Sequence, residues 1–297
     1  MQKIRNSVLV GLVGGALVLS TGGVHAEDIS GTIVRTLILS ETTRLVGNVT
    51  CTVQGAPCIA FGAPGIALYL NGFTITGLAD PATGCSSGAA VANEFGISTN
   101  NQSNVGVRGP GVVQRFRNSG IFFTGTVRGQ VEGVTATTNC GSGIQVQANS
   151  SSIRVEANVL VRNGRPGGSC GGICIIGSDN IIQWNETSGN GYADPNDDYG
   201  IGIVAGNNNR VEANTCIGNT NGIILFPPST NSIVRGNVVV GNPPVQLSVS
   251  LPGTPGVDIW DRSAPGTTNF DSNLCLTSIN APCPSLSPKP IPRKPVQ

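Results

Sequence analysis

The sequence predicts an all-β chain that folds as a right-handed parallel β-helix of about eight coils with an N-terminal cap. Two repeated phrases support this fold: a Gly–apolar pair that recurs along the chain, and a following phrase in which asparagines align in two columns. The composition agrees, because 42 of the 297 residues are glycine and only 4% are aromatic. Such a mix is typical of many short strands joined by tight turns.

The Gly–apolar pair marks the start of one strand in each coil. Its copies are Gly96-Ile97, Gly120-Ile121, Gly143-Ile144, Gly172-Ile173, Gly200-Ile201, Gly222-Ile223 and Gly256-Val257. Successive copies are 24, 23, 29, 28, 22 and 34 residues apart, so the period is about 22 to 24 residues, with insertions in three coils. A propeller blade needs about 40 residues, and a leucine-rich repeat needs a leucine frame that this chain lacks.

Asparagine recurs at two fixed positions in the phrase that follows each pair. The first column contains Asn158, Asn185, Asn214, Asn237 and Asn273, and the second contains Asn139, Asn163, Asn190, Asn219 and Asn242. One coil cannot bury its own core, so coils must stack, and parallel crossovers are almost always right-handed. Parallel strands lie about 4.8 Å apart, which places equivalent side chains directly above one another. The aligned amides are therefore expected to hydrogen-bond along each column.

The two ends of the chain differ in composition from the repeats. Residues 1–26 have the anatomy of a secretory signal peptide, with Lys3 and Arg5 before an apolar stretch and small residues up to Ala26. The apolar run is shorter than the ~20 residues that a membrane span requires. We therefore expect a cleaved signal peptide, a β-helix domain with its cap over 27–281, and a Pro-rich, extended and poorly ordered tail over 282–297.

Cleavage would remove the only histidine, His25. The mature chain then cannot use Ser-His-Asp or Cys-His catalysis, or a histidine-ligated zinc or copper site. Loss of Lys3 and Arg5 would leave 15 basic and 16 acidic residues, a net charge of −1, which gives no attraction to nucleic acid. The expected location is secreted or periplasmic with no membrane span in the mature chain, and the oligomeric state stays open.

The nine cysteines fit disulfides in an exported chain better than a metal site. They are Cys51, Cys58, Cys85, Cys140, Cys170, Cys174, Cys216, Cys275 and Cys283. An oxidising compartment preserves disulfides, and the chain has no CxxC motif. An odd number leaves at least one thiol unpaired or paired between chains.

Spacing suggests which cysteines pair. Cys51 and Cys58 are close enough in sequence to close a short loop near the N-terminal cap, and Cys275 and Cys283 can do the same near the C-terminus.

Two further cysteines, Cys140 and Cys170, occupy nearly equivalent places on successive coils, so a pair between them is expected, with Cys85 as a competitor for Cys140. Cys174 and Cys216 fall in strands and are expected to be buried thiols.

All the length variation falls at one corner of the coil, between the second asparagine column and the next Gly–apolar pair. One of these insertions holds the candidate catalytic residues Asp194, Asp197 and Asp198, together with Tyr192 as a candidate for substrate binding. Clustered carboxylates can bind Ca²⁺ or act as acid and base in sugar chemistry. They are also ordinary turn formers, and this second interpretation is the one we favour.

The last coil adds three more candidates for substrate binding, Asp258, Trp260 and Asp261. Alternation along the strand that each Gly–apolar pair opens predicts one outward residue in each coil. These residues are Ser98, Phe122, Gln145, Cys174, Gly202, Ile224 and Asp258. With one carboxylate and no Lys or Arg, this row does not suggest an active site, and no metal site is assigned.

By its repeat units, the chain resembles the large group of right-handed parallel β-helix repeat proteins, the pectate-lyase-like superfamily. The phrases that carry the resemblance are LYLNGFTITG, YGIGIVAGNNNRVEANTCIGN and TNGIILFPPSTNSIVRGNVVVGN, and the resemblance covers most of residues 45–278. It is specific for the fold and implies little about function, because this fold carries lyases, hydrolases, epimerases and proteins without catalysis.

Single families within the group match less well. The segment Gly191-Tyr192-Ala193-Asp194-Pro195-Asn196-Asp197 is similar in part to the Tyr-Gly-Phe-Asp-Pro-His-Asp motif of alginate epimerases, with Asn196 where the histidine would stand. Asn196-Asp197-Asp198 is a faint likeness to polygalacturonases, again without the histidine. Pectate-lyase-like enzymes use Ca²⁺ and an arginine base, and their motif does not match residue by residue.

Two functions follow as hypotheses. The favoured one is an exported, non-catalytic β-helix that binds a polysaccharide or forms a surface scaffold and needs no cofactor. The alternative is a polysaccharide lyase or C5-epimerase for uronic-acid glycans that uses the insertion-edge carboxylates, with Ca²⁺ as the cofactor of the lyase.

Overall fold

The computed structural model describes residues 27–79, 85, 91–164, 171–191, 198–242 and 256–283. Residues 1–26, expected to be a signal peptide, and the tail beyond Cys283 lie outside these residues, as do Cys170, Tyr192, Asp194 and Asp197. No helix among the described residues is long and apolar enough to cross a membrane.

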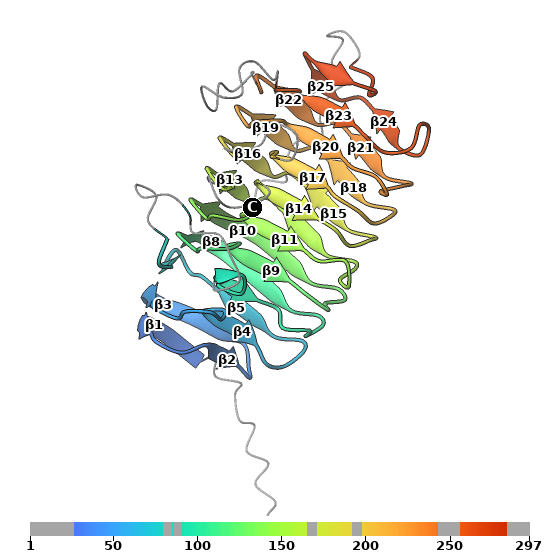
Figure 1. Ribbon diagram of the computed structural model, residues 1–297. Coiled ribbons are helices and arrows are strands. Elements are labelled where there is room, and N and C mark those ends of the chain that lie inside the picture. The colour runs from blue at the N-terminus through green and yellow to red at the C-terminus, as the bar shows by residue number, and fades with distance from the viewer. Residues whose placement is uncertain are drawn as a thin grey trace, which may run out of the picture.

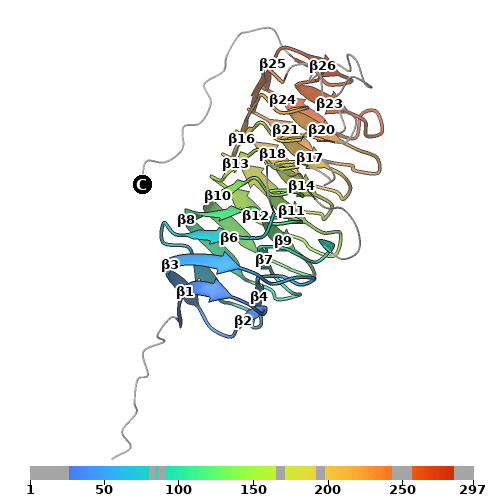
Figure 2. The same cartoon turned by 60° about the vertical axis from the view of Figure 1, so that its left-hand side comes forward.

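Every named element of the described chain is a β-strand, and the strands stack in a single column of coils (Figure 1). Figure 2 shows β1 and β2 at one end of the stack and β25 and β26 at the other. The strands form one sixteen-stranded and one ten-stranded sheet, and their pairings are parallel. These stacked parallel sheets confirm the predicted all-β coil architecture.

The ten-stranded sheet takes one short strand from each coil. Its strands are β2 (Leu37–Leu39), β4 (Ile59–Phe61), β7 (Ile97–Ser98), β9 (Ile121–Phe123), β11 (Ile144–Val146), β14 (Ile173–Ile175), β17 (Ile201–Ile203), β20 (Ile223–Leu225), β23 (Ile259–Asp261) and β26 (Ser278–Ile279).

The sixteen-stranded sheet has two rows of short strands that meet at a corner. Row 1 contains β5 (Ala67–Tyr69), β12 (Arg154–Glu156), β15 (Ile181–Gln183), β18 (Arg210–Glu212), β21 (Ile233–Arg235) and β24 (Asn269–Asp271). Row 2 contains β6 (Thr74–Thr76), β13 (Val159–Val161), β16 (Glu186–Ser188), β19 (Thr215–Ile217), β22 (Val238–Val240) and β25 (Leu274–Cys275). The longer strands β1 (Glu27–Ile33), β3 (Thr43–Cys51), β8 (Gly106–Gln114) and β10 (Gln130–Thr137) complete the sheet, and β3, β8 and β10 extend across both rows.

The core fills the inside of the coils through strand alternation. In the ten-stranded sheet the first and third residues of a strand point inward, so Ile144 and Val146 are fully buried while Gln145 between them is half-buried. In both rows of the larger sheet the middle residue points inward, as Val211 and Val239 do. Stacked Ile, Val and Leu side chains therefore form one continuous core.

The two predicted asparagine columns are present and buried inside the corners of the coils. In the first column, the side-chain Nδ2 of Asn185 donates to Oδ1 of Asn214 at 2.9 Å, and Asn214 donates in the same way to Asn237 at 3.0 Å. Each backbone N–H also donates to the Oδ1 of the next coil, as Asn185 does to Asn214 at 2.9 Å. The side-chain amides thus provide hydrogen-bond partners for backbone N–H groups at the corner, where the chain turns and the backbone pairing between strands is interrupted.

The second column ends in a carboxylate. Asn242 donates from both its backbone N and its Nδ2 to Oδ1 of Asp258, at 3.2 and 2.8 Å. The other oxygen of Asp258 accepts the backbone N–H groups of Leu276 and Thr277, at 2.9 and 3.0 Å. Asp258 is 2% exposed, so it acts as the terminal member of the column.

The structure contains two of the expected disulfides and corrects a third. Cys51 bonds to Cys58, and Cys275 bonds to Cys283. The expected Cys140–Cys170 pair is wrong, because the sulfur of Cys140 bonds to that of Cys85, 55 residues earlier, across a Cα–Cα distance of 5.6 Å.

Cys216 is a core thiol at the centre of β19, and burial raises its pKa to about 12. The thiolate is the reactive form of cysteine, so we expect Cys216 to resist alkylation in the folded protein at mildly alkaline pH. Mass spectrometry after maleimide treatment should show modification of Cys216 only when urea is present. A Cys216→Ala variant identifies the peptide concerned, and rapid labelling of folded protein at Cys216 would contradict the expectation.

Candidate functional site

Of the residues singled out for chemistry, the structure describes Asp198, Asp258, Trp260 and Asp261. Asp198 lies just before β17 and is 5% exposed, and its backbone carbonyl accepts a hydrogen bond from Nδ2 of Asn221 at 2.8 Å. Trp260 and Asp261 lie together on β23, two strands further along the ten-stranded sheet.

The outward residue of the last full coil is Trp260, and the prediction of Asp258 at this place was wrong. The register pairs Ile223 with Ile259 and Ile224 with Trp260. The Gly256-Val257 pair imitates the repeat but lies before the strand. Asp258 instead lies opposite Gly222, where its carboxylate faces the second asparagine column.

Asp261 holds the loop that follows β23. Its Oδ1 accepts hydrogen bonds from the backbone N and the hydroxyl of Ser263, at 2.9 and 2.5 Å. The Ser263 hydroxyl also lies 3.3 Å from the hydroxyl of Thr267 and 3.1 Å from that of Thr268. Asp261 therefore positions the 262–268 loop.

The outer face of the ten-stranded sheet carries a second apolar cluster, separate from the core inside the coils. Tyr199 is 1% exposed and donates a hydrogen bond from its hydroxyl to the Cys174 sulfur at 3.2 Å. The rings of Tyr199 and Phe226 lie 5.8 Å apart at 60°. Cys174 and Ile224, although outward on their strands, are thereby fully buried.

Arg262 joins the two aromatic side chains at the edge of this cluster. Its guanidinium carbon lies 5.0 Å from the ring centre of Phe226 and 4.8 Å from that of Trp260. Both distances are within the range of cation–π attraction. Phe226, Trp260 and Arg262 are all partly exposed, so they form an aromatic platform at the surface.

Tyr199 can lie flat against the sheet because position 202 has no side chain. A Cβ at Gly202 would come within 2.2 Å of the Tyr199 ring. We expect Gly202→Ala to displace Tyr199, to change the near-ultraviolet circular dichroism and to lower the unfolding free energy by about 2 kcal/mol. Gly106→Ala is the matched control, because its Cβ would meet nothing closer than 3.4 Å. Equal loss in both variants would contradict this role for Gly202.

A polar hollow of about 410 Å³ lies at the corner where the 262–268 loop reaches β24. It is lined by Asn231, Ser232, Ile233, Gly266, Thr267, Thr268 and Asn269. Amides and hydroxyls can both donate and accept hydrogen bonds. We call the aromatic platform and this hollow together the C-terminal corner, because the loop ordered by Asp261 connects them.

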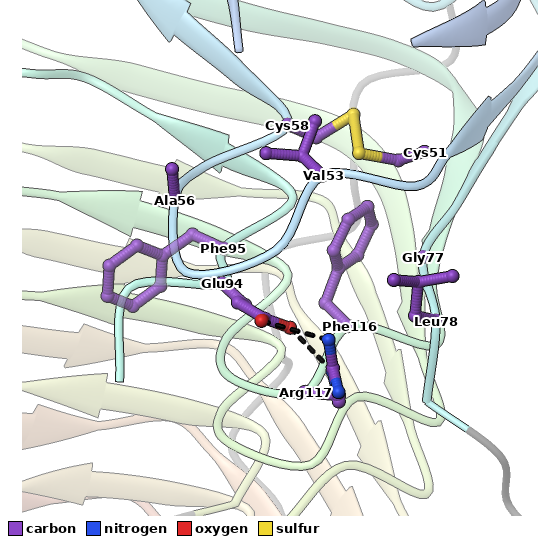
Figure 3. A pocket seen from close by; sticks show the side chains of 10 residues that line it. All are labelled: Cys51, Val53, Ala56, Cys58, Gly77, Leu78, Glu94, Phe95, Phe116 and Arg117. Carbon is purple, nitrogen blue, oxygen red and sulfur yellow. Dashed lines mark hydrogen bonds and ion pairs between the residues drawn. A yellow bond between two sulfur atoms is a disulfide. The ribbon is translucent and has the colours of Figure 1, made fainter. Parts of the chain in front are cut away.

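A second cavity, near the N-terminal end, is too small for a ligand (Figure 3). Its volume is about 10 Å³, roughly that of one water site. Glu94 at its wall binds Arg117 through two contacts of 2.5 and 2.9 Å and accepts the Gly55 N–H at 2.8 Å. Through the Gly55 contact, the Glu94–Arg117 ion pair holds the 52–57 loop against the coil, which is a structural role.

Within the described ranges, no group of three or more His, Cys, Asp or Glu side chains is placed to hold a metal ion.

The chain resembles known proteins in structure and not in sequence. No protein family and no curated protein sequence matches the chain. Among solved structures, the Dettilon tailspike protein is 16% identical, with a TM-score of 0.57 over 82% of this chain and 54% of the tailspike chain.

This chain is a parallel β-helix protein.

Other β-helix structures align with lower scores. A D317A mutant of the periplasmic alginate epimerase AlgG aligns at 13% identity and a TM-score of 0.49, over 77% of this chain and 51% of AlgG. The Azotobacter vinelandii mannuronan C-5 epimerase AlgE6 A-module aligns at 11% identity and a TM-score of 0.43, over 84% of each chain. The β-helix thus spans about half the length of the tailspike and AlgG chains, and the likeness concerns the fold.

Proposed function

We propose that this β-helix is an exported polysaccharide-binding protein that holds a glycan at the C-terminal corner without cleaving it. The observation that carries the proposal is the partly exposed platform of Phe226, Trp260 and Arg262 beside a hollow of amides and hydroxyls. Aromatic side chains offer a large apolar surface with little conformational entropy to lose, which suits the apolar face of a sugar ring. The hollow offers donors and acceptors for sugar hydroxyls.

The carboxylates nearest to the platform favour binding over catalysis. The Asp258 oxygens accept four N–H hydrogen bonds, and Oδ1 of Asp261 is engaged with Ser263. A general acid or base must reach the proton that it transfers, and these two side chains already serve the fold. The tailspike and epimerase likenesses support the scaffold only, so the proposal depends on the corner.

Export accounts for the disulfides. Three bonds join six of the cysteines, which is usual in oxidising compartments and rare in the cytoplasm. We therefore place the mature protein in the periplasm or outside the cell. Mass determination of the protein recovered from its host would test this, because export with cleavage predicts a mature N-terminus directly after Ala26.

Intrinsic fluorescence offers a direct test, because the chain has two tryptophans and only Trp260 lies on the platform. Titration with a panel of polysaccharide fragments should change the Trp260 emission. Trp260→Ala removes this reporter, so its affinity is measured by calorimetry and should be at least about tenfold weaker, or roughly 1.4 kcal/mol. Trp184→Phe is the matched control and should bind as the wild type does.

Two results would overturn the proposal. Equal affinities of the wild type and Trp260→Ala for the polysaccharide would show that the platform does not bind it. Appearance of unsaturated or epimerised sugar products, lost in an Asp194→Ala, Asp197→Ala variant, would replace a binding protein with a lyase or epimerase.

A further inference from the structure

The outer surface of row 1 carries a continuous column of polar side chains along the stack. The pairings place one residue of this column on each successive coil: Asp28, Arg44, Tyr69, Arg108, Glu132, Glu156, Gln183, Glu212, Arg235 and Asp271. We call these ten residues the polar column. At about 4.8 Å per strand it is about 43 Å long.

Hydrogen bonds connect the middle of the column, from Arg108 to Gln183, across successive coils. Arg108 donates to Glu132 at 2.5 Å and to Gln130 at 2.7 Å. Gln130 donates onward to Glu156 at 3.1 Å. Glu156 also accepts from Gln183 on the following coil. Because Arg108, Glu156 and Gln183 are held by these bonds, binding a ligand there would cost little additional side-chain entropy.

The same pattern continues toward the C-terminal end. Glu212 accepts hydrogen bonds from Arg210 at 3.0 and 3.1 Å and from Arg235 at 2.9 Å. Arg210 and Arg235 are about half exposed, so their remaining N–H groups face solvent. These donors are available to a ligand that lies on the surface.

Charges on this face are balanced. The column, together with the outward residues two positions earlier on the same strands, contains five arginines and five carboxylates. They are Arg44, Arg108, Arg154, Arg210, Arg235, Asp28, Glu132, Glu156, Glu212 and Asp271. A surface with no excess of either sign gives a polyanion no net electrostatic attraction. It can still hydrogen-bond a hydroxyl-rich chain, since arginine donates and carboxylates and glutamine accept.

The hollow of the C-terminal corner opens onto the end of this column. Ile233 and Asn269 line the hollow, and they lie two residues before Arg235 and Asp271 on the same strands. The column therefore continues from the hollow along β24, β21, β18, β15 and β12 (Figures 1 and 2). The distance between strands is close to the length of one hexose unit.

We infer that the polar column extends the C-terminal corner into an elongated binding surface for an uncharged polysaccharide, which lies along the helix axis with about one sugar for each coil. This inference rests on the proposed function, because the corner supplies the first binding contacts. To the proposed function it adds a substrate class, an uncharged polymer, and an affinity that increases with the length of the polysaccharide.

Calorimetry with oligosaccharides of increasing length tests the inference. Neutral fragments too short to leave the corner should bind weakly, and longer ones should bind about tenfold or more tightly. Gln183→Ala should remove most of this gain and leave the affinity for short fragments unchanged. Ser188→Ala, on the outer surface of row 2 of the same coil, is the matched control and should keep the gain.

The outcomes separate the two proposals. Equal affinities for short and long neutral chains would overturn the polar column while leaving the corner intact. Tighter binding of uronic-acid chains with a steep salt dependence would overturn the uncharged substrate class. If no short fragment binds, and Trp260→Ala binds long fragments as tightly as the wild type does, the C-terminal corner is not the binding site.

Discussion

Asn214→Ala is expected to destabilise the protein by about 4 kcal/mol, one of the largest effects of any single substitution in the chain. The side-chain Nδ2 donates to the Ile182 carbonyl at 2.9 Å and to Asn237 at 3.0 Å. Its Oδ1 accepts the backbone N–H and the Nδ2 of Asn185, both at 2.9 Å. Alanine would remove all four bonds and leave a buried N–H of Asn185 without an acceptor, which alone costs about 1–3 kcal/mol.

Urea unfolding measures this effect, with Asn207→Ala as the control. Asn207 lies on the exposed side of the same coil, and its side chain accepts one hydrogen bond, from Thr230 at 2.5 Å, so its replacement should cost less than about 1 kcal/mol. Similar unfolding free energies for the two variants would show that the columns contribute little beyond ordinary strand pairing.

Asp258→Asn is expected to cost about 3 kcal/mol and to loosen the last coil. Each carboxylate oxygen accepts two N–H bonds. In either orientation, the NH₂ group of an asparagine would therefore face two N–H donors and could not accept from them. Hydrogen bonds to a charged acceptor are worth about 1.5–3 kcal/mol each, and a buried N–H left unpaired adds to the loss. Because Leu276 and Thr277 depend on this carboxylate, their amides should exchange faster with deuterated solvent.

Asp271→Asn provides the comparison for Asp258→Asn. Asp271 is exposed, and its carboxylate accepts one hydrogen bond, from the adjacent Ser272 hydroxyl at 2.8 Å. Its replacement should leave both the unfolding free energy and the exchange rates nearly unchanged. Unaltered protection of the Leu276 amide in Asp258→Asn would contradict the role of Asp258 as the end of the column.

The fold could be predicted because the features that build it repeat. Each Asn of a column contacts its equivalent on the next coil, so the structural contact is visible as sequence spacing. A third, shorter ladder joins Asn180 to Asn209 at 2.9 Å and was not predicted, since two members do not establish a period.

The candidate site could be predicted only in part, because its residues do not repeat. Trp260 and Asp261 stood out as an aromatic side chain beside a carboxylate, and both lie at the C-terminal corner. Phe226 and Arg262 were missed because three-dimensional proximity, rather than spacing, brings them to Trp260.

The sequence offered the true partner of Cys140, Cys85, only as a competitor of Cys170. The Cys85–Cys140 bond joins an insertion to a coil, and an insertion has no equivalent position elsewhere in the chain with which to compare it.

The disulfide positions also determine how the stack should respond to mechanical tension. The strands run across the axis, so a pull along the axis loads the bonds of one coil at a time, and coils should detach sequentially from an end. Cys51–Cys58 and Cys275–Cys283 close short loops and shorten little of the released chain. Cys85–Cys140 encloses a longer segment and would withhold it from extension. The protein should therefore yield coil by coil and then lengthen less than its residue count predicts.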